Sequence, residues 1–119
     1  MLVLSLRTDN PQAEIGLFDE REKLEYETWM AHRQLAETIH TKLRDLLKSQ
    51  DKDWSIVKGI VCFKGPGSFT GLRIGLSVAN ALASSLGVPI VAEKGDNWIQ
   101  TGLVRLQNGE NDVFAWPDY

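Results

Sequence analysis

Hydrophobic side chains alternate with polar ones in three segments near the N-terminus, and this is the period of half-buried strands. Turn-forming residues separate the segments at positions 8–11 and 19–22. The first thirty residues therefore predict an antiparallel three-stranded meander. The alternating positions are Leu2, Leu4 and Leu6, then Ile15 and Leu17, then Leu24, Tyr26 and Thr28.

The pattern changes to a helical period from about residue 31 to residue 49. Leu35, Ile39 and Leu43 fall on one face of this segment, and most of its charged side chains fall elsewhere. This pattern predicts an amphipathic helix that lies on the sheet.

A strand–helix–strand unit is predicted after a polar link. Residues 56–63 form an apolar run, residues 70–86 have a helical pattern that ends at Gly87, and residues 90–92 form a second apolar run. A crossover of about 25 residues between two strands favours a parallel βαβ unit. Together with the meander, this predicts an α/β fold.

The C-terminal residues are expected to pack on the same domain. Residues 96–107 predict a short helix that is capped by Asp96 and directs Ile99, Leu103 and Leu106 inward. Residues 113–116 are interpreted as a last strand or an ordered end. We therefore expect one lobe over residues 1–93 and a helix/strand tail over residues 94–119.

Composition narrows the classes of protein to consider. A chain of 119 residues, 43% of them hydrophobic, suits one domain with one sizeable core. The net charge is −3 and there are no basic runs, which disfavours direct, tight binding of nucleic acid. The single cysteine, Cys62, lies in an apolar run and is expected to be buried, in a chain suited to the reducing cytosol.

No membrane or metal site is expected. Residues 74–92 are uncharged but fit a buried helix and strand better than a membrane span, and no basic segment precedes the apolar N-terminus. His32 and His40 lie eight positions apart with no carboxylate or cysteine at ligand spacing. These features predict a cytoplasmic protein with no metal.

The stretch KGPGSFTGLRIG, residues 64–75, raises the question of phosphate binding or catalysis. A Walker-type loop is excluded because Leu72 stands where its lysine should be. A nucleophile elbow around Ser68 is excluded because Pro66 and Thr70 replace its glycines. A dinucleotide-binding turn remains as an alternative, although its third glycine falls one place late at Gly71.

The remaining interpretation of this stretch is structural. It is a tight turn in which glycines permit positive φ and close backbone approach, and in which Ser68 or Thr70 caps the following helix. The turn residues are Gly65, Pro66, Gly67, Ser68 and Gly71.

The helix that follows the glycine turn has two apolar stripes. One comprises Leu72, Gly75, Leu76, Ala79, Leu82 and Leu86, and the other Ile74, Val78, Ala81 and Ser85. A helix on a single small sheet needs only one buried face. The second stripe therefore needs a cover, either the first helix or another protein, and its small side chains favour a protein interface.

The residues Gly65 to Gly75, with the apolar strand before them and Gly87-Val88-Pro89-Ile90-Val91 after them, closely resemble the signature of the TsaB (YeaZ) family. The resemblance extends more loosely over residues 1–92. It implies a lobe of the actin, sugar-kinase and Hsp70 (ASKHA) type, with a mixed five-stranded sheet and helices. Most of the second lobe usual in such folds is absent from this sequence.

The resemblance also implies a function. Family members are accessory subunits in the threonylcarbamoyladenosine modification of tRNA, and they bind the catalytic subunit TsaD without catalysing the reaction themselves. We therefore expect a non-catalytic scaffold with no cofactor, which pairs with a TsaD-like subunit as a heterodimer. The alternative is a stand-alone nucleotide-binding or peptidase-like enzyme that uses the glycine turn.

Further partners follow from the same resemblance. A TsaE-like ATPase is expected to dock on the complex, tRNA is expected to be contacted only through the complex, and a homodimer is expected when the partner is absent. The expected partner interface, mapped residue by residue, consists of His32, Leu35, Ile39, Thr70, Arg73, Ile74, Ser77, Val78 and Ala81.

Overall fold

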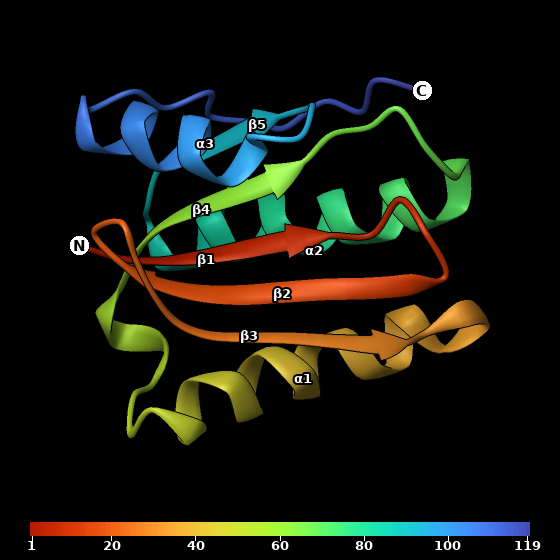
Figure 1. The fold of residues 1–119 in the computed structure, drawn as a ribbon, viewed down its shortest axis with the longest axis horizontal. Coiled ribbons are helices and arrows are strands. Elements are labelled where there is room, and N and C mark those ends of the chain that lie inside the picture. The colour runs from red at the N-terminus through yellow and green to blue at the C-terminus, as the bar shows by residue number, and fades with distance from the viewer.

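The computed structural model describes residues 1–119 and contains one five-stranded mixed sheet with the strand order β3-β2-β1-β4-β5 (Figure 1). β1 is antiparallel to β2 and parallel to β4, and β5 is parallel to β4. The predicted α/β fold, a meander followed by a βαβ unit, is confirmed. The elements are β1 (Leu2–Arg7), β2 (Gln12–Asp19), β3 (Glu22–Met30), α1 (Leu35–Ser49), β4 (Val57–Phe63), α2 (Phe69–Leu86), β5 (Ile90–Glu93) and α3 (Trp98–Gln107).

Both faces of the central strands are buried, which differs from the half-buried strand that the alternation in β1 predicted. Leu4 shares a core cluster with Ile39 of α1 and Leu76 of α2. Its neighbour Val3 belongs to a second cluster with Leu103 of α3. The helices therefore divide between the two faces, with α1 and α2 on one and α3 on the other (Figure 1).

The helix α2 ends as predicted but begins differently. Gly87 adopts the left-handed conformation at a φ of 68° and closes the helix. Ser68 occupies the N-cap position, yet its side chain makes no capping hydrogen bond, and its backbone N–H donates instead to the Asp9 carbonyl at 3.1 Å. The prediction of a side-chain cap by Ser68 or Thr70 is therefore wrong.

None of the helices combines the length and hydrophobicity needed to span a bilayer.

The predicted third helix is present, but its cap was assigned wrongly. Asn97, not Asp96, is the N-cap residue, and it makes no side-chain capping bond. Leu103 and Leu106 are buried as predicted. Trp98, which was not among the side chains predicted to point inward, is also buried, and its ring packs edge-on against a phenylalanine of β4.

The C-terminal tail, residues 111–119, lies along β5 as an ordered end and forms no strand. The Ile90 backbone N–H donates to Asn111 Oδ1 at 3.1 Å, and the Ile90 carbonyl accepts from the Asp112 N–H at 2.8 Å. The Ala92 N–H donates to Asp112 Oδ2 at 2.9 Å. Asn111 and Asp112 thus supply hydrogen-bond partners to the backbone groups at the edge of β5, two through side-chain oxygens and one through the Asp112 N–H. In a larger sheet, a neighbouring strand would supply these partners.

Two further contacts anchor the tail. Asn80 of α2 donates to the Ala115 carbonyl at 3.1 Å and accepts from the Ala115 N–H at 2.7 Å, and Ala115 is only 1% exposed. Closer to the C-terminus, the Asp118 N–H donates to the Lys64 carbonyl at 2.7 Å. The tail therefore connects α2, β4 and β5.

Replacing Asn80 by alanine is expected to lower the free energy of unfolding by about 1–3 kcal/mol, because both buried backbone groups of Ala115 lose their partner. Urea unfolding followed by circular dichroism measures this change, and limited proteolysis should cut the tail faster in the variant. Asn108→Ala is the matched control, since Asn108 is exposed. Equal stability of the two variants would contradict the anchoring role.

Candidate functional site

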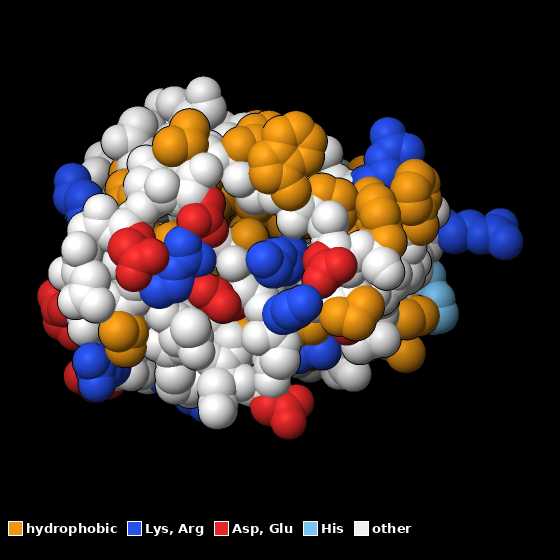
Figure 2. Space-filling model, turned by 90° about the horizontal axis from the view of Figure 1, so that it is seen from above, with side chains coloured by type: hydrophobic (Ala, Val, Ile, Leu, Met, Phe, Trp, Pro, Cys, Tyr) orange, Lys and Arg blue, Asp and Glu red, His pale blue; other side chains and the backbone are white.

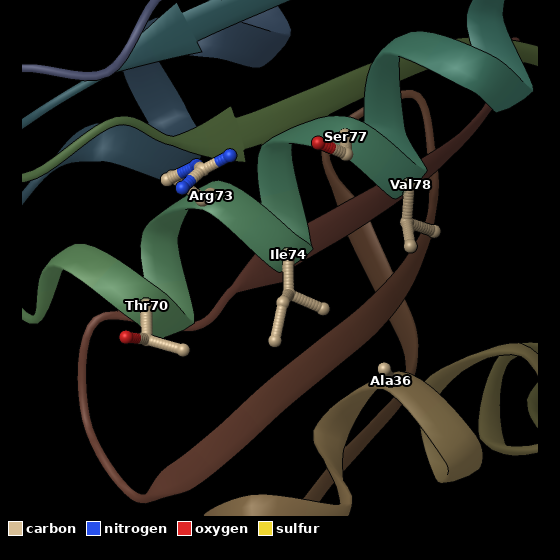
Figure 3. A pocket seen from close by; sticks show the side chains of 6 residues that line it. All are labelled: Ala36, Thr70, Arg73, Ile74, Ser77 and Val78. Atoms are coloured by element: carbon tan, nitrogen blue, oxygen red, sulfur yellow. The ribbon is translucent and has the colours of Figure 1, made fainter.

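The helices α1 and α2 lie side by side on one face of the sheet, and an open groove of about 330 Å³ runs between them (Figure 3). Ile74 and Val78 of α2 point toward Ala36 of α1 across this groove. Both apolar side chains are only half-buried. The groove is lined by Ala36, Thr70, Arg73, Ile74, Ser77 and Val78.

Most of the interface residues expected from the sequence surround this groove. Thr70, Arg73, Ile74, Ser77 and Val78 line it directly. A second hollow continues from its Thr70 end toward the start of α1, and its lining includes His32, Arg33 and Leu35. Ala81 is exposed on α2 outside both linings.

Two expected interface residues have little surface in this structure. Leu35 is 4% exposed and Ile39 is 1% exposed, and both belong to the core beneath α1 and α2. They support the groove from below and leave almost no surface for a partner. The residues expected from the sequence did not include Ala36 of α1, which lines the groove.

The glycines of the turn are packed against the corner that follows β1. A Cβ atom added at Gly67 would come closer than 3.0 Å to Asp9, and one added at Gly71 or Gly75 would come equally close to Thr8. The Thr8 hydroxyl donates to the Gly71 carbonyl at 2.8 Å. These glycines are therefore required for close approach between α2 and the end of β1.

The turn is closed on its other side by the tail. Gly65 has a φ of 116°, a conformation that favours glycine, and a Cβ atom there would meet the Asp118 carbonyl oxygen. The ring of Phe69 packs against that of Tyr119 at a centroid distance of 4.7 Å. The tail thus packs against the turn at Gly65 and Phe69.

The corner after β1 carries a network of paired charges. Arg7 donates to both carboxylate oxygens of Asp9, at 2.8 and 3.2 Å, and lies over the ring of Phe63 at 3.9 Å. The hydrogen bond to Asp9 raises the pKa of Arg7 above its ordinary value. Burial and a hydrogen bond to Glu14 raise the pKa of Tyr26. Arg7 is therefore charged and Tyr26 neutral at neutral pH.

The single cysteine is inert, as its position in the sequence suggested. Cys62 is 1% exposed in β4. Burial raises the pKa of its thiol to about 12, so the reactive thiolate is not formed at neutral pH.

A second surface lies over α3 and the tail. Figure 2 shows hydrophobic side chains here beside a band of mixed positive and negative charge. Trp116 is 71% exposed, and its ring packs on Phe114 at 4.6 Å. Arg105 pairs with Glu93 at 2.9 Å and also with Asp112. The charges on this surface therefore largely neutralise one another.

Gly75→Ala is expected to lower the free energy of unfolding by about 1–3 kcal/mol, because the added methyl group meets Thr8 in a fully packed contact. Thermal unfolding followed by circular dichroism measures the loss. Combining it with Thr8→Ala should recover part of the loss, since two of the clashing atoms are removed. Ser84→Gly, at an exposed position of the same helix, controls for glycine content, and a Gly75→Ala variant as stable as the wild type would refute the close approach.

A family model supports the fold assignment. Residues 29–94, which include α1, the glycine turn and α2, match the model "TsaD: tRNA N6-adenosine threonylcarbamoyltransferase". The match covers more than half of the chain. It spans both helices that form the groove.

Individual relatives include TsaB proteins and also a tRNA N6-adenosine threonylcarbamoyltransferase, that of Geotalea daltonii, which is 34% identical over 71% of this chain and 24% of that protein. The chain is 36% identical to the tRNA threonylcarbamoyladenosine biosynthesis protein TsaB of Bacillus subtilis, over 77% of this chain and 40% of that protein. It is 27% identical to the TsaB protein of Escherichia coli, over 99% of this chain and 50% of that protein. The chain spans half or less of the length of these relatives.

A solved structure supports the same family assignment. YeaZ from Pseudomonas aeruginosa superposes with a TM-score of 0.73 at 30% sequence identity, over 91% of this chain and 50% of that one. Fold, family model and relatives all agree with the resemblance carried by residues 65–75. The chain belongs to the TsaB (YeaZ) family.

Proposed function

We propose that this chain is a non-catalytic scaffold subunit that binds a TsaD-like catalytic subunit in the synthesis of tRNA threonylcarbamoyladenosine. The observation that carries the proposal is the groove between α1 and α2, where Ile74 and Val78 remain half-buried. A partner that covers this groove completes the burial of the second apolar stripe of α2.

The rest of the α2 surface suits a closely packed partner. Beyond the groove, its exposed positions are Phe69 at the first residue of the helix, and then Ala81, Ser84 and Ser85, which carry small side chains. Small side chains allow the backbone of a second helix to approach closely. Arg73 is the only charged residue in the whole of α2, so little charge would have to be desolvated at the centre of such an interface.

The packing of the glycine turn against other parts of the chain favours the scaffold role over an independent catalytic role. Gly67 and Gly71 are packed on Asp9 and Thr8, and Gly65 is packed on the tail. The turn thus fixes the start of α2, which carries the groove. The chain would order the catalytic subunit and leave the chemistry to it.

The other partners are proposed on the same basis. With a net charge of −3, the chain is expected to meet tRNA only through the complex. A TsaE-like ATPase would dock on the assembled pair, in the cytoplasm. Without its partner, the chain would form a homodimer that covers the groove.

Ile74→Glu and Val78→Glu are each expected to abolish co-purification with the TsaD-like subunit of the same organism, because a charge is placed in the apolar centre of the groove. Affinity capture of a tagged catalytic subunit measures the loss, and circular dichroism verifies that each variant is folded. Val104→Glu is the matched control, since Val104 is 36% exposed on α3, on the opposite side of the sheet. Undiminished capture of both groove variants would remove the groove from the interface.

A separate experiment tests the alternative that this chain is a stand-alone nucleotide-binding enzyme. Isothermal titration of the isolated chain with ATP, and then with a nicotinamide dinucleotide, is expected to show no binding at micromolar concentrations, because the turn has Leu72 in place of the lysine of a Walker-type loop and its third glycine falls one place late for a dinucleotide-binding turn. Saturable micromolar binding of either ligand would favour the enzyme and contradict the scaffold.

A further inference from the structure

The arginines of this chain differ in whether they have a polar partner. Arg7 and Arg105 pair with carboxylates, Arg44 lies 3.7 Å from its neighbour Asp45, and Arg21 donates to a glutamine. The other two, Arg33 and Arg73, make no hydrogen bond and no ion pair. Both are exposed.

These two unpaired arginines line two adjoining hollows. Arg73 is part of the lining of the groove, and Arg33 is part of the adjoining hollow, which shares Thr70 and Ile74 with the groove. Neither lining contains an aspartate or a glutamate. In a chain whose net charge is −3, this is a local positive surface without its own counter-charges.

The Arg73 guanidinium is also held in place. It lies 5.2 Å from the centre of the Phe69 ring, and that ring packs against Tyr119 of the tail at 4.7 Å. Stacking on an aromatic ring limits the conformations of an arginine and leaves its donors free along the edge. A planar cation held in this way suits recognition of a carboxylate.

We propose that the groove takes a partner helix with an apolar stripe and with acidic side chains at one end. The stripe lies on Ile74 and Val78, and the carboxylates meet Arg33 and Arg73. This assignment rests on the proposed function, since the TsaD-like subunit supplies the helix. It adds the chemistry of recognition: apolar contact holds the helix, and the carboxylates set its direction along the groove.

Charge complementarity also separates this partner from a second copy of the chain. A symmetric dimer through the groove would bring together two linings that each contain arginine and no carboxylate. Like charges across an interface oppose association. An acidic helix is therefore the favoured occupant, and the homodimer is the weaker complex.

Affinity for the purified TsaD-like subunit of the same organism tests the proposal. The combined variant Arg33→Glu/Arg73→Glu is expected to bind about tenfold more weakly than the wild type at low ionic strength, since attraction becomes repulsion. Raising the salt concentration should weaken the wild type and not the variant. Arg44→Glu is the matched control, because it reverses an exposed arginine of α1 outside both linings, and its affinity should stay within about twofold of the wild type.

A second measurement locates the carboxylates directly. Arg73→Lys places a primary amine at the groove, and a carbodiimide then joins amines to carboxylates that are in contact. Mass spectrometry is expected to find Lys at position 73 joined to an aspartate or glutamate of the TsaD-like subunit. A cross-link between two copies of this chain would identify the occupant as a second copy and overturn the proposal.

The outcomes separate this inference from the function on which it rests. If Ile74→Glu and Val78→Glu abolish binding while Arg33→Glu/Arg73→Glu binds as tightly as the wild type, acidic recognition is wrong and the groove remains the interface. If the apolar variants also bind normally, or if the wild type does not bind, the proposed function fails and this inference fails with it.

Discussion

The packing of the glycine turn on the corner after β1 is the contact on which the rest of the structure depends. It joins residues 8–9 to residues 67–75, which lie far apart along the chain. No side chain larger than hydrogen fits at Gly67, Gly71 or Gly75 without a clash. This close approach sets the position of α2 on the sheet, and the position of α2 relative to α1 creates the groove.

The groove exists because α1 covers α2 only in part. One stripe of α2 is buried against the sheet, and Ile74 and Val78 of the second stripe face the gap toward α1. Ala36 is the α1 side chain opposite Ile74 and Val78, and it is too small to close that gap. A small residue at one position thus leaves an apolar surface that a partner helix can complete.

The tail performs two tasks without regular secondary structure. Asn111 and Asp112 satisfy the edge of β5 with their side chains, which protects the sheet from pairing with another chain. Tyr119 packs on Phe69, beside Arg73 of the groove. The last residues of the chain therefore link the sheet edge to the surface proposed for the partner.

The sequence by itself determined the order and type of the elements, because the hydrophobic period of each segment is a local property and Gly87 marks the end of α2 directly. It also indicated Ile74 and Val78, since a second apolar stripe on a helix is visible in a linear pattern. The helical period also placed Leu35 and Ile39 on the apolar face of the first helix, and both are buried in the core. Only the tertiary structure showed that Thr8 and Asp118 close the glycine turn, and that Arg33 and Arg73 line adjoining hollows whose linings contain no carboxylate. Contacts of this kind join residues distant in the chain, and their geometry depends on how the helices pack on the sheet.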